Sequence, residues 1–210
     1  MEKSNFLYYP ATDLVILAGG QARRMGGQNK LRLNIDGALQ FIKIYRAFYD
    51  QVAQIWINSS QDIAYYRAVY PALKYFADDT AGYYGPLMGM KSAWSHVNTD
   101  YILFIPCDIT YIAADILLHM HRCLAAHQSS QVVVACCNGQ LLYPFCLLKR
   151  ASLSALKQSL QQQQFSLRRC FKALHMQSIA VQCPTDFHSI NSTTALLDYQ
   201  QALKAIGHKI

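Results

Sequence analysis

Short apolar runs recur along this chain, and the segments between them carry apolar residues at helical spacing. The first run, DLVILA at residues 13–18, is rich in β-favouring residues and ends at two glycines, which is typical of a buried parallel strand. Similar runs lie at residues 54–58, 73–77, 101–106 and 131–136, and two weaker ones read LLYPFCLL and SIAVQ. Helices are expected around residues 39–49, 87–97, 113–126, 151–163 and 193–206. This alternation predicts a three-layer α/β fold, in which helices cover both faces of a mainly parallel central sheet.

Composition narrows the class of protein. The 210 residues are 52% hydrophobic and 15% charged, which is enough apolar material for a sizeable core and excludes a disordered chain. We expect one domain over residues 12–210, with residues 1–11 as an N-terminal tail or edge extension. No apolar run reaches the ~18 to 20 residues of a membrane span, and the N-terminus lacks a signal-peptide pattern. We therefore expect a cytoplasmic protein with no membrane partner.

The cysteines and the basic residues exclude two further classes. Seven cysteines without a CxxC pair fit neither a disulfide framework nor a zinc ribbon, so we expect buried thiols in a reducing compartment. The net charge is +7, but no basic run is long enough for a DNA-binding arm, and we expect no nucleic-acid partner. The basic cluster at residues 23–32 lies beside glycines, which favours a phosphate ligand.

The loop after the first predicted strand is the strongest candidate for a phosphate site. Ligands of open parallel sheets bind at the carboxyl ends of the strands. This loop, GGQARRMGGQNK at residues 19–30, holds four glycines, two arginines and a lysine. Glycines let backbone amides approach a phosphate chain, and Arg24 and Lys30 would neutralise its charge. The spacing matches neither GxGxxG nor the P-loop motif.

A second loop, PCDIT at residues 106–110, places Asp108 just past a buried strand. A desolvated, unpaired carboxylate is costly, so Asp108 should meet solvent, a helix N-terminus or a cation such as Mg²⁺. We favour the magnesium site over a cap of the helix expected from residue 113, because the spacing suits a cap poorly. A third segment, DDTAGYYGPLMGM at residues 78–90, fits a backbone close to a planar ligand and a tight strand-to-helix connection equally well.

The order of these motifs resembles that of a known family. LAGGQARRMGGQNK at residues 17–30 resembles the LAGGxSxRMGxxK signature of the molybdenum cofactor guanylyltransferases, the MobA group of nucleotidyltransferases with a Rossmann-like α/β fold. The resemblance continues through Asn58, Asp78 ahead of GPLMGM, PCDIT, Tyr143-Pro144 and INSTTAL at residues 190–196, which is similar to a late NxNTPEEL segment of the family. It spans about residues 13–200, and its N-terminal half is the more specific.

The resemblance implies an enzyme that transfers GMP from GTP to the terminal phosphate of molybdopterin or molybdenum-molybdopterin, with Mg²⁺, and releases pyrophosphate. Asp108 would bind the metal, and Lys30 and Arg24 would act with it as catalytic residues. The implied GTP contacts are Leu17, Ala18, Gly19, Gly20, Lys30, Asn58, Asp78, Pro86, Leu87 and Gly89. The implied pterin contacts are Tyr143 and Asn191, while Arg168 and Arg169 form either a solvated helix face or a landing site for the pterin phosphate. Transient contact with cofactor-insertion or molybdoenzyme proteins is also expected.

The chemistry suits these residue types without a nucleophilic side chain. A phosphate monoester has a second pKa of ~6, so the attacking group is already anionic near neutral pH. An in-line displacement then needs alignment and neutralisation of charge on the phosphates. Two alternatives remain open: a transferase of the same fold that acts on a sugar phosphate, and a nucleotide- or pterin-binding protein with weakened catalysis.

The sequence departs from the family pattern at several positions: besides the two below, INSTTAL lacks the acidic pair of TPEEL, and the HPT-like element reads Tyr143-Pro144-Phe145. Asn29 stands where the family commonly has an aspartate before the lysine, and Ser189 replaces the first asparagine of NxN. An asparagine can accept a hydrogen bond from Lys30 but supplies no charge. We therefore expect Asn29→Asp to be tolerated or to raise activity.

Overall fold

The computed structural model describes residues 9–19, 29–35, 37–59, 62–71, 73–80, 82, 84–110, 112–181, 189–190 and 193–205. Within them the strands are β1 (Thr12–Leu17), β2 (Asn34–Ile35), β3 (Ala38–Leu39), β4 (Ile55–Asn58), β5 (Lys74–Phe76), β6 (Tyr101–Pro106), β7 (Val132–Cys137), β8 (Gln140–Lys149) and β9 (Gln177–Val181). The helices are α1 (Gln40–Phe48), α2 (Ile63–Val69), α3 (Pro86–Ala93), α4 (Ile116–Ala126), α5 (Leu153–Gln161), α6 (Leu167–Ala173) and α7 (Thr193–Ala205). Two 3₁₀ turns cover Lys30–Arg32 and Arg150–Ser152. No helix in these parts of the chain is long and apolar enough to cross a bilayer.

The central sheet confirms the predicted fold class. It has seven strands in the order β5-β4-β1-β6-β8-β7-β9. β1 pairs in parallel with β4 and β6, and β7 pairs in parallel with β9. Only β8 runs antiparallel to its neighbours β6 and β7 within this sheet. Strands β2 and β3 form a separate small hairpin.

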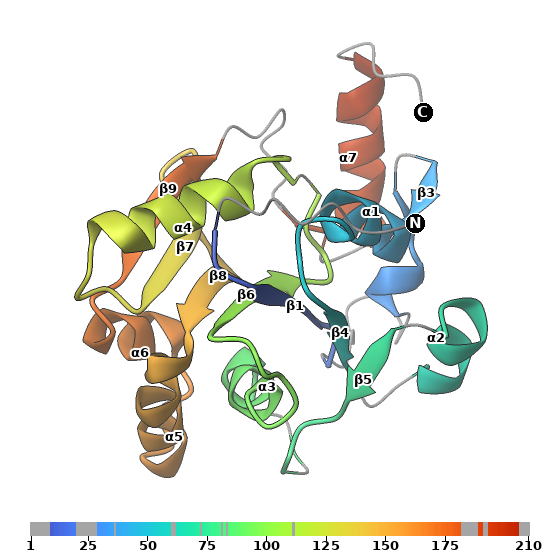
Figure 1. The fold of residues 1–210 in the computed structure, drawn as a ribbon. Helices are drawn as coiled ribbons and strands as arrows, with labels where there is room; N and C mark the ends of the chain where they lie inside the picture. The colour runs from blue at the N-terminus through green and yellow to red at the C-terminus, as the bar shows by residue number, and fades with distance from the viewer. Residues whose placement is uncertain are drawn as a thin grey trace.

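Helices cover both faces of the sheet, as Figure 1 shows, with α1, α2 and α4 on one face and α3, α5 and α6 on the other. The six residues of β1 are all buried, and their side chains alternate between the two layers. Leu14 and Ile16 pack in the α1 layer, whereas Val15 and Leu17 pack in the α3 layer. A strand that is apolar on both faces is what the continuous DLVILA run predicts.

Several elements lie where the sequence predicts them, and some do not. α1, α4, α5 and α7 fall within the expected helical ranges, and LLYPFCLL and SIAVQ form most of β8 and β9. The short helix α2 and the β2–β3 hairpin have no counterpart among the predicted elements. These segments are too short to show a helical or strand-like spacing of apolar residues. The division into one domain and an N-terminal extension stays a prediction.

The cysteines differ in part from the expected set of buried thiols. Within the described residues five are free; Cys146 and Cys170 are buried, Cys107, Cys123 and Cys136 are only partly buried, and Cys137 at the end of β7 is disulfide-bonded. The expectation is wrong at this residue because sequence spacing does not show which distant cysteines the fold brings within bonding range.

Candidate active site at the carboxyl edge of the sheet

The predicted site segments meet at one edge of the sheet. Leu17, the last residue of β1, is in register with Asn58 at the end of β4 and with Pro106 at the end of β6. Asn58 is in turn in register with Phe76 of β5, two residues before Asp78. Strand order therefore places the carboxyl ends of β5, β4, β1 and β6 side by side, at the edge where α/β proteins bind ligands.

Lys30 and Asp108 form an ion pair across this edge. Lys30 Nζ lies 2.9 Å from Asp108 Oδ2, although the residues are 78 apart in sequence. The two side chains are only 15% and 17% exposed, so their attraction is less screened than that of a surface pair. The structure thus brings together the lysine and the carboxylate that the sequence assigned to phosphate and to metal.

The loop that carries Asp108 is fixed along its backbone. Cys107 N donates to Leu17 O at 3.2 Å, and Ile190 N donates to Asp108 O at 3.0 Å. Ile109 forms an isolated antiparallel bridge with Ser189. The N-cap position of α4 is occupied by Asp115, so the capping role considered for Asp108 is wrong.

The neighbouring thiol takes no part in nucleophilic chemistry at neutral pH. Burial raises the pKa of Cys107 to about 12, and the negative charge of Asp108 adds to this effect, while Lys30 opposes it. The thiolate is the reactive form of cysteine. Cys107 is therefore protonated and unreactive beside the Lys30–Asp108 pair.

Asn29 has a structural role that the sequence comparison missed. Its Oδ1 accepts a hydrogen bond from Leu31 N at 3.1 Å and so caps the 3₁₀ turn that begins at Lys30. Its Nδ2 donates to Asp62 Oδ2 at 2.8 Å. An aspartate here would place two carboxylates against each other. Because the amide N–H group is in use, the structure argues against the expectation that Asn29→Asp is tolerated, and the activity of this variant stays a prediction.

Asn58, Asp78 and Gly89 form a second cluster at the same edge. Asn58 is 3% exposed, and its Nδ2 donates to Asp78 Oδ1 at 2.8 Å. Its Oδ1 lies so close to Gly89 of α3 that a side chain at this position would overlap the Asn58 amide. Burial raises the pKa of Asp78 and the hydrogen bond from Asn58 lowers it. This cluster is a pair of polar groups held in place by the close approach of a helix.

The remaining residues predicted to contact GTP differ in what they can offer a ligand. Pro86 is exposed at the first position of α3, and Ala18 and Gly19 follow β1 at the sheet edge. The side chains of Leu17 and Leu87 are buried in the α3 layer, so only their backbone can face a ligand. Gly20 and Arg24 lie outside the described residues.

The residues predicted to contact a pterin lie around β8 and α6. The Tyr143 ring packs 5.7 Å from that of Phe171, and its hydroxyl donates to Met176 Sδ at 3.2 Å. Burial raises the pKa of Tyr143, and the positive charge of Arg168 lowers it by a smaller amount. Arg169 is exposed, and its backbone N donates to Ser166 Oγ at the start of α6. Asn191 lies outside the described residues.

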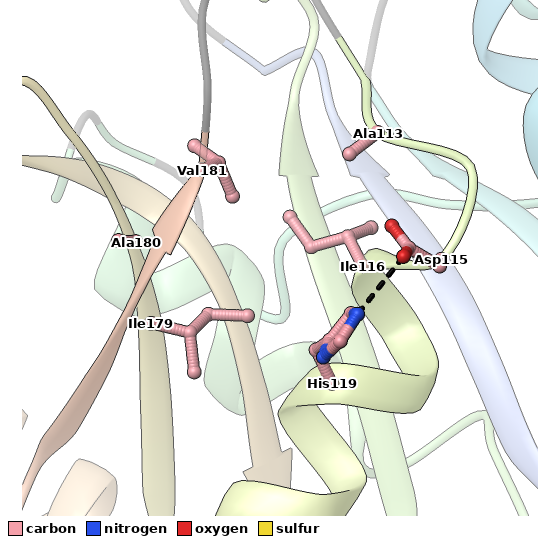
Figure 2. Close-up of a pocket in the computed structure, with 7 residues that line it drawn as sticks. All are labelled: Ala113, Asp115, Ile116, His119, Ile179, Ala180 and Val181. Carbon is pink, nitrogen blue, oxygen red and sulfur yellow. Dashed lines mark hydrogen bonds and ion pairs between the residues drawn. The ribbon is translucent and has the colours of Figure 1, made fainter.

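A separate pocket of about 360 Å³ lies between α4 and β9. Figure 2 shows Ile179 and Val181 of β9 facing Ile116 and His119 of α4. His119 bonds to Asp115 at 2.9 Å along its own helix, and His127 likewise contacts the Cys123 carbonyl. Within the described residues, no cluster of three His, Cys, Asp or Glu side chains is present. The pocket contains none of the predicted site residues.

Sequence comparison identifies close relatives. A family model described as MobA-like NTP transferase domain matches residues 14–178. A molybdenum cofactor guanylyltransferase of Acinetobacter baumannii is 52% identical over 194 residues, which cover 92% of this chain and 93% of that protein. The protein of the same name from Shewanella frigidimarina is 34% identical over 150 residues, or 71% of this chain and 74% of that protein.

Solved structures share the fold at low sequence identity. Molybdopterin-guanine dinucleotide biosynthesis protein A from Archaeoglobus fulgidus superposes with a TM-score of 0.70 at 13% identity, covering 92% of this chain and 99% of that one. A CMP:2-keto-3-deoxy-manno-octonic acid synthetase solved with CTP gives a TM-score of 0.68 at 17% identity, covering 93% and 99%. These likenesses establish the nucleotidyltransferase fold.

Proposed function

Because this chain belongs to the MobA-like NTP transferase family, we propose that it is a molybdenum cofactor guanylyltransferase. It transfers GMP from GTP to the terminal phosphate of molybdopterin or molybdenum-molybdopterin and releases pyrophosphate. The observation that carries the proposal is the Lys30–Asp108 pair at the carboxyl ends of β1 and β6, in a chain 52% identical to a relative of that name.

Asp108 fits the role of a magnesium ligand. Mg²⁺ binds through one or two carboxylates together with substrate phosphates, and does not need a cage made of protein side chains alone. Asp108 supplies one partly exposed carboxylate, and its Oδ2 already faces a cationic group. When bound, Mg²⁺ would neutralise charge on the phosphates of GTP.

The side chains of this site act by position and charge. Lys30 moves from the Asp108 carboxylate to the phosphates when GTP binds, and Arg24 adds a second positive charge. The acceptor phosphate is anionic near neutral pH, since its second pKa is ~6, so it attacks the α-phosphorus without a strong general base. Lys30, Arg24 and the backbone amides after β1 stabilise the charge that develops on the transferring group and on pyrophosphate.

The two substrates occupy neighbouring parts of the edge. Asn58 and Asp78 hold the nucleoside of GTP, and the backbone of residues 17–20 and of Pro86, Leu87 and Gly89 lies against it. Tyr143 and Asn191 contact the pterin ring, and Arg168 and Arg169 receive its phosphate. The reaction takes place in the cytoplasm, and the product passes to cofactor-insertion or molybdoenzyme proteins by transient contact.

The test is pyrophosphate release with GTP, ATP, CTP or UTP as the donor, in the presence of Mg²⁺ and a molybdopterin source. We expect release with GTP alone, and none from Asp108→Ala under the same conditions. Release with CTP or with a sugar phosphate acceptor would overturn the proposal in favour of another transferase of the same fold. Measurable GTP binding without release would favour a binding protein.

A further inference from the structure

Gln40 stands out because it is a buried polar side chain that none of the roles above explains. It is the first residue of α1 and is 1% exposed. Its Nε2 donates a hydrogen bond to the carbonyl oxygen of Ile109, 69 residues away in sequence. Within the described residues its Oε1 has no hydrogen-bond partner, so the amide is oriented by its N–H group alone. Buried polar side chains normally satisfy all their hydrogen-bonding atoms, so one that keeps a single long-range bond calls for an explanation. Here the bond ties the start of α1 to the backbone at Ile109.

The two hydrogen bonds of Gln40 reach both segments that carry the ion pair. Its backbone N donates to Leu33 O at 2.9 Å, directly after the 3₁₀ turn that begins at Lys30. Its side chain bonds to Ile109, the residue after Asp108. One residue at the start of a helix thus joins the Lys30 segment to the Asp108 loop.

Other residues also bond to the Asp108 loop. Lys43 lies on the same face of α1, one turn further on, and its Nζ is 3.5 Å from Thr110 O. Ile190 donates to Asp108 O through its backbone N, and its side chain packs beside Leu33. The Asp108 loop therefore has other supports, and loss of the Gln40 amide alone should not unfold it.

We propose that Gln40 is a positioning residue that holds the backbone of the Lys30 segment against that of the Asp108 loop, and so places both side chains for phosphoryl transfer. The inference rests on the proposed function, since that function gives both side chains their roles. Small errors in the placement of reacting groups lower turnover strongly, by ~10²-fold for about 1 Å. Asn58 and Asp78 are held by α3 and not by Gln40, so nucleoside binding should be affected much less.

The first test compares Gln40→Met with Gln51→Met. Methionine keeps the length of the side chain and removes the N–H group. Gln51 follows α1 and makes the same kind of bond, to Ala47 O at 2.6 Å and Ala114 O at 3.1 Å, away from Asp108. We expect Gln40→Met to lower kcat by ~10-fold or more and to change the KM for GTP by less than ~3-fold. Gln51→Met should leave both unchanged, at a similar Tm. An unchanged kcat in Gln40→Met, or an equal loss in Gln51→Met, would overturn the proposal.

The second test is a double-mutant cycle on GTP affinity, measured by calorimetry with Mg²⁺ present. Gln40→Met should weaken binding by ~2-fold in the wild-type background, in line with the small change expected in KM, and cause no further loss in Asp108→Asn, because it acts through that carboxylate. Equal losses in both backgrounds would show a structural role alone. The cycle needs no turnover, so a wild-type protein that binds GTP without releasing pyrophosphate would contradict the proposed function and still test Gln40.

Discussion

The two halves of the carboxyl edge hold the side chains proposed to act on the substrates in different ways. Between β1 and β6, Lys30 and Asp108 bond directly to each other, and backbone hydrogen bonds fix the Asp108 loop. Between β8 and α6, Tyr143 packs on Phe171, and Arg168 acts on it through its charge. The first half therefore holds opposite charges at a set distance before any ligand binds. The second half relies on the packing of an aromatic ring and on a nearby positive charge. Phosphoryl transfer requires precise placement of charged groups, which only the first half provides.

The largest expected effect comes from removing either charge in the first half. Lys30→Ala and Asp108→Ala should each lower turnover by ~10²-fold or more, on the scale of losing one preorganised electrostatic contact. Circular dichroism should show that both variants stay folded. Asp115→Ala, at an exposed carboxylate at the N-cap position of α4 that makes no side-chain cap hydrogen bond, is the matched control and should keep full activity. Full activity of either site variant would show that turnover does not depend on the paired charges of the first half.

A smaller loss is expected from Gly89→Ala, which tests how rigidly the cluster of Asn58, Asp78 and Gly89, proposed to hold the nucleoside, is kept in place. The added methyl group would overlap the Asn58 amide and displace its bond to Asp78. We expect the KM for GTP to rise by ~10-fold, the scale of one lost hydrogen bond to a charged group. Gly139→Ala, in the turn between β7 and β8, meets no atom within 4 Å and should leave the KM unchanged, although its positive φ should lower the Tm. A normal KM in Gly89→Ala would mean that α3 yields to the methyl group.

A substitution in the second half should change the KM for the pterin substrate and leave the KM for GTP unchanged. Arg168→Ala removes the cation beside Tyr143 and should raise the KM for the pterin by ~5-fold, a loss typical of a partly exposed charged contact. The KM for GTP should stay the same. Lys172→Ala, at an exposed residue of the same helix, is the control. A rise in the KM for GTP would show that the two halves are not independent.

Mild acid should weaken the scaffold beneath both halves. Burial lowers the pKa of His121 from 6.5 to about 4. Thr12 Oγ1 donates to Pro10 O, so it accepts from His121 Nε2 at 2.8 Å, which fixes the neutral tautomer. Between pH 6.5 and 4 the unfolded chain binds the proton and the folded protein does not. The stability from this group is therefore complete above pH 6.5 and is lost as the pH falls towards 4.

We expect urea denaturation to give a free energy of unfolding ~2 kcal/mol lower at pH 4.5 than at pH 7 from this residue. His121→Phe keeps an aromatic ring against Tyr9 and Tyr101 and should remove this part of the pH dependence. If the free energy of unfolding fell with pH as steeply in His121→Phe as in the wild type, other groups would be responsible for the acid sensitivity. Activity per folded molecule should depend on Lys30 and Asp108, not on His121.

The amino-acid sequence predicts the strands of this molecule better than its contacts. The continuous apolar runs identify β1, β4 and β6, and the loops after them identify Lys30, Asn58 and Asp108, because strand ends in a parallel sheet converge. The Lys30–Asp108 bond, by contrast, depends on the direction in which the 3₁₀ turn presents its first residue. Asn29 and Gln40 were missed or misread because their partners, Asp62 and Ile109, lie 33 and 69 residues away. Local patterns carry no signal for such pairs.

The strand order also determines when the site comes into existence during folding. β7 and β8 are joined by a tight turn and can pair as a local hairpin, whereas β1 must wait for β6 to be made before their ladder can close. A nascent chain that has completed β1 and α1 holds Lys30 without its carboxylate. The positive loop acquires its counter-charge only when the central strands join. A chain synthesised only as far as α1 therefore carries Lys30 but not the Asp108 carboxylate that faces it in the folded protein.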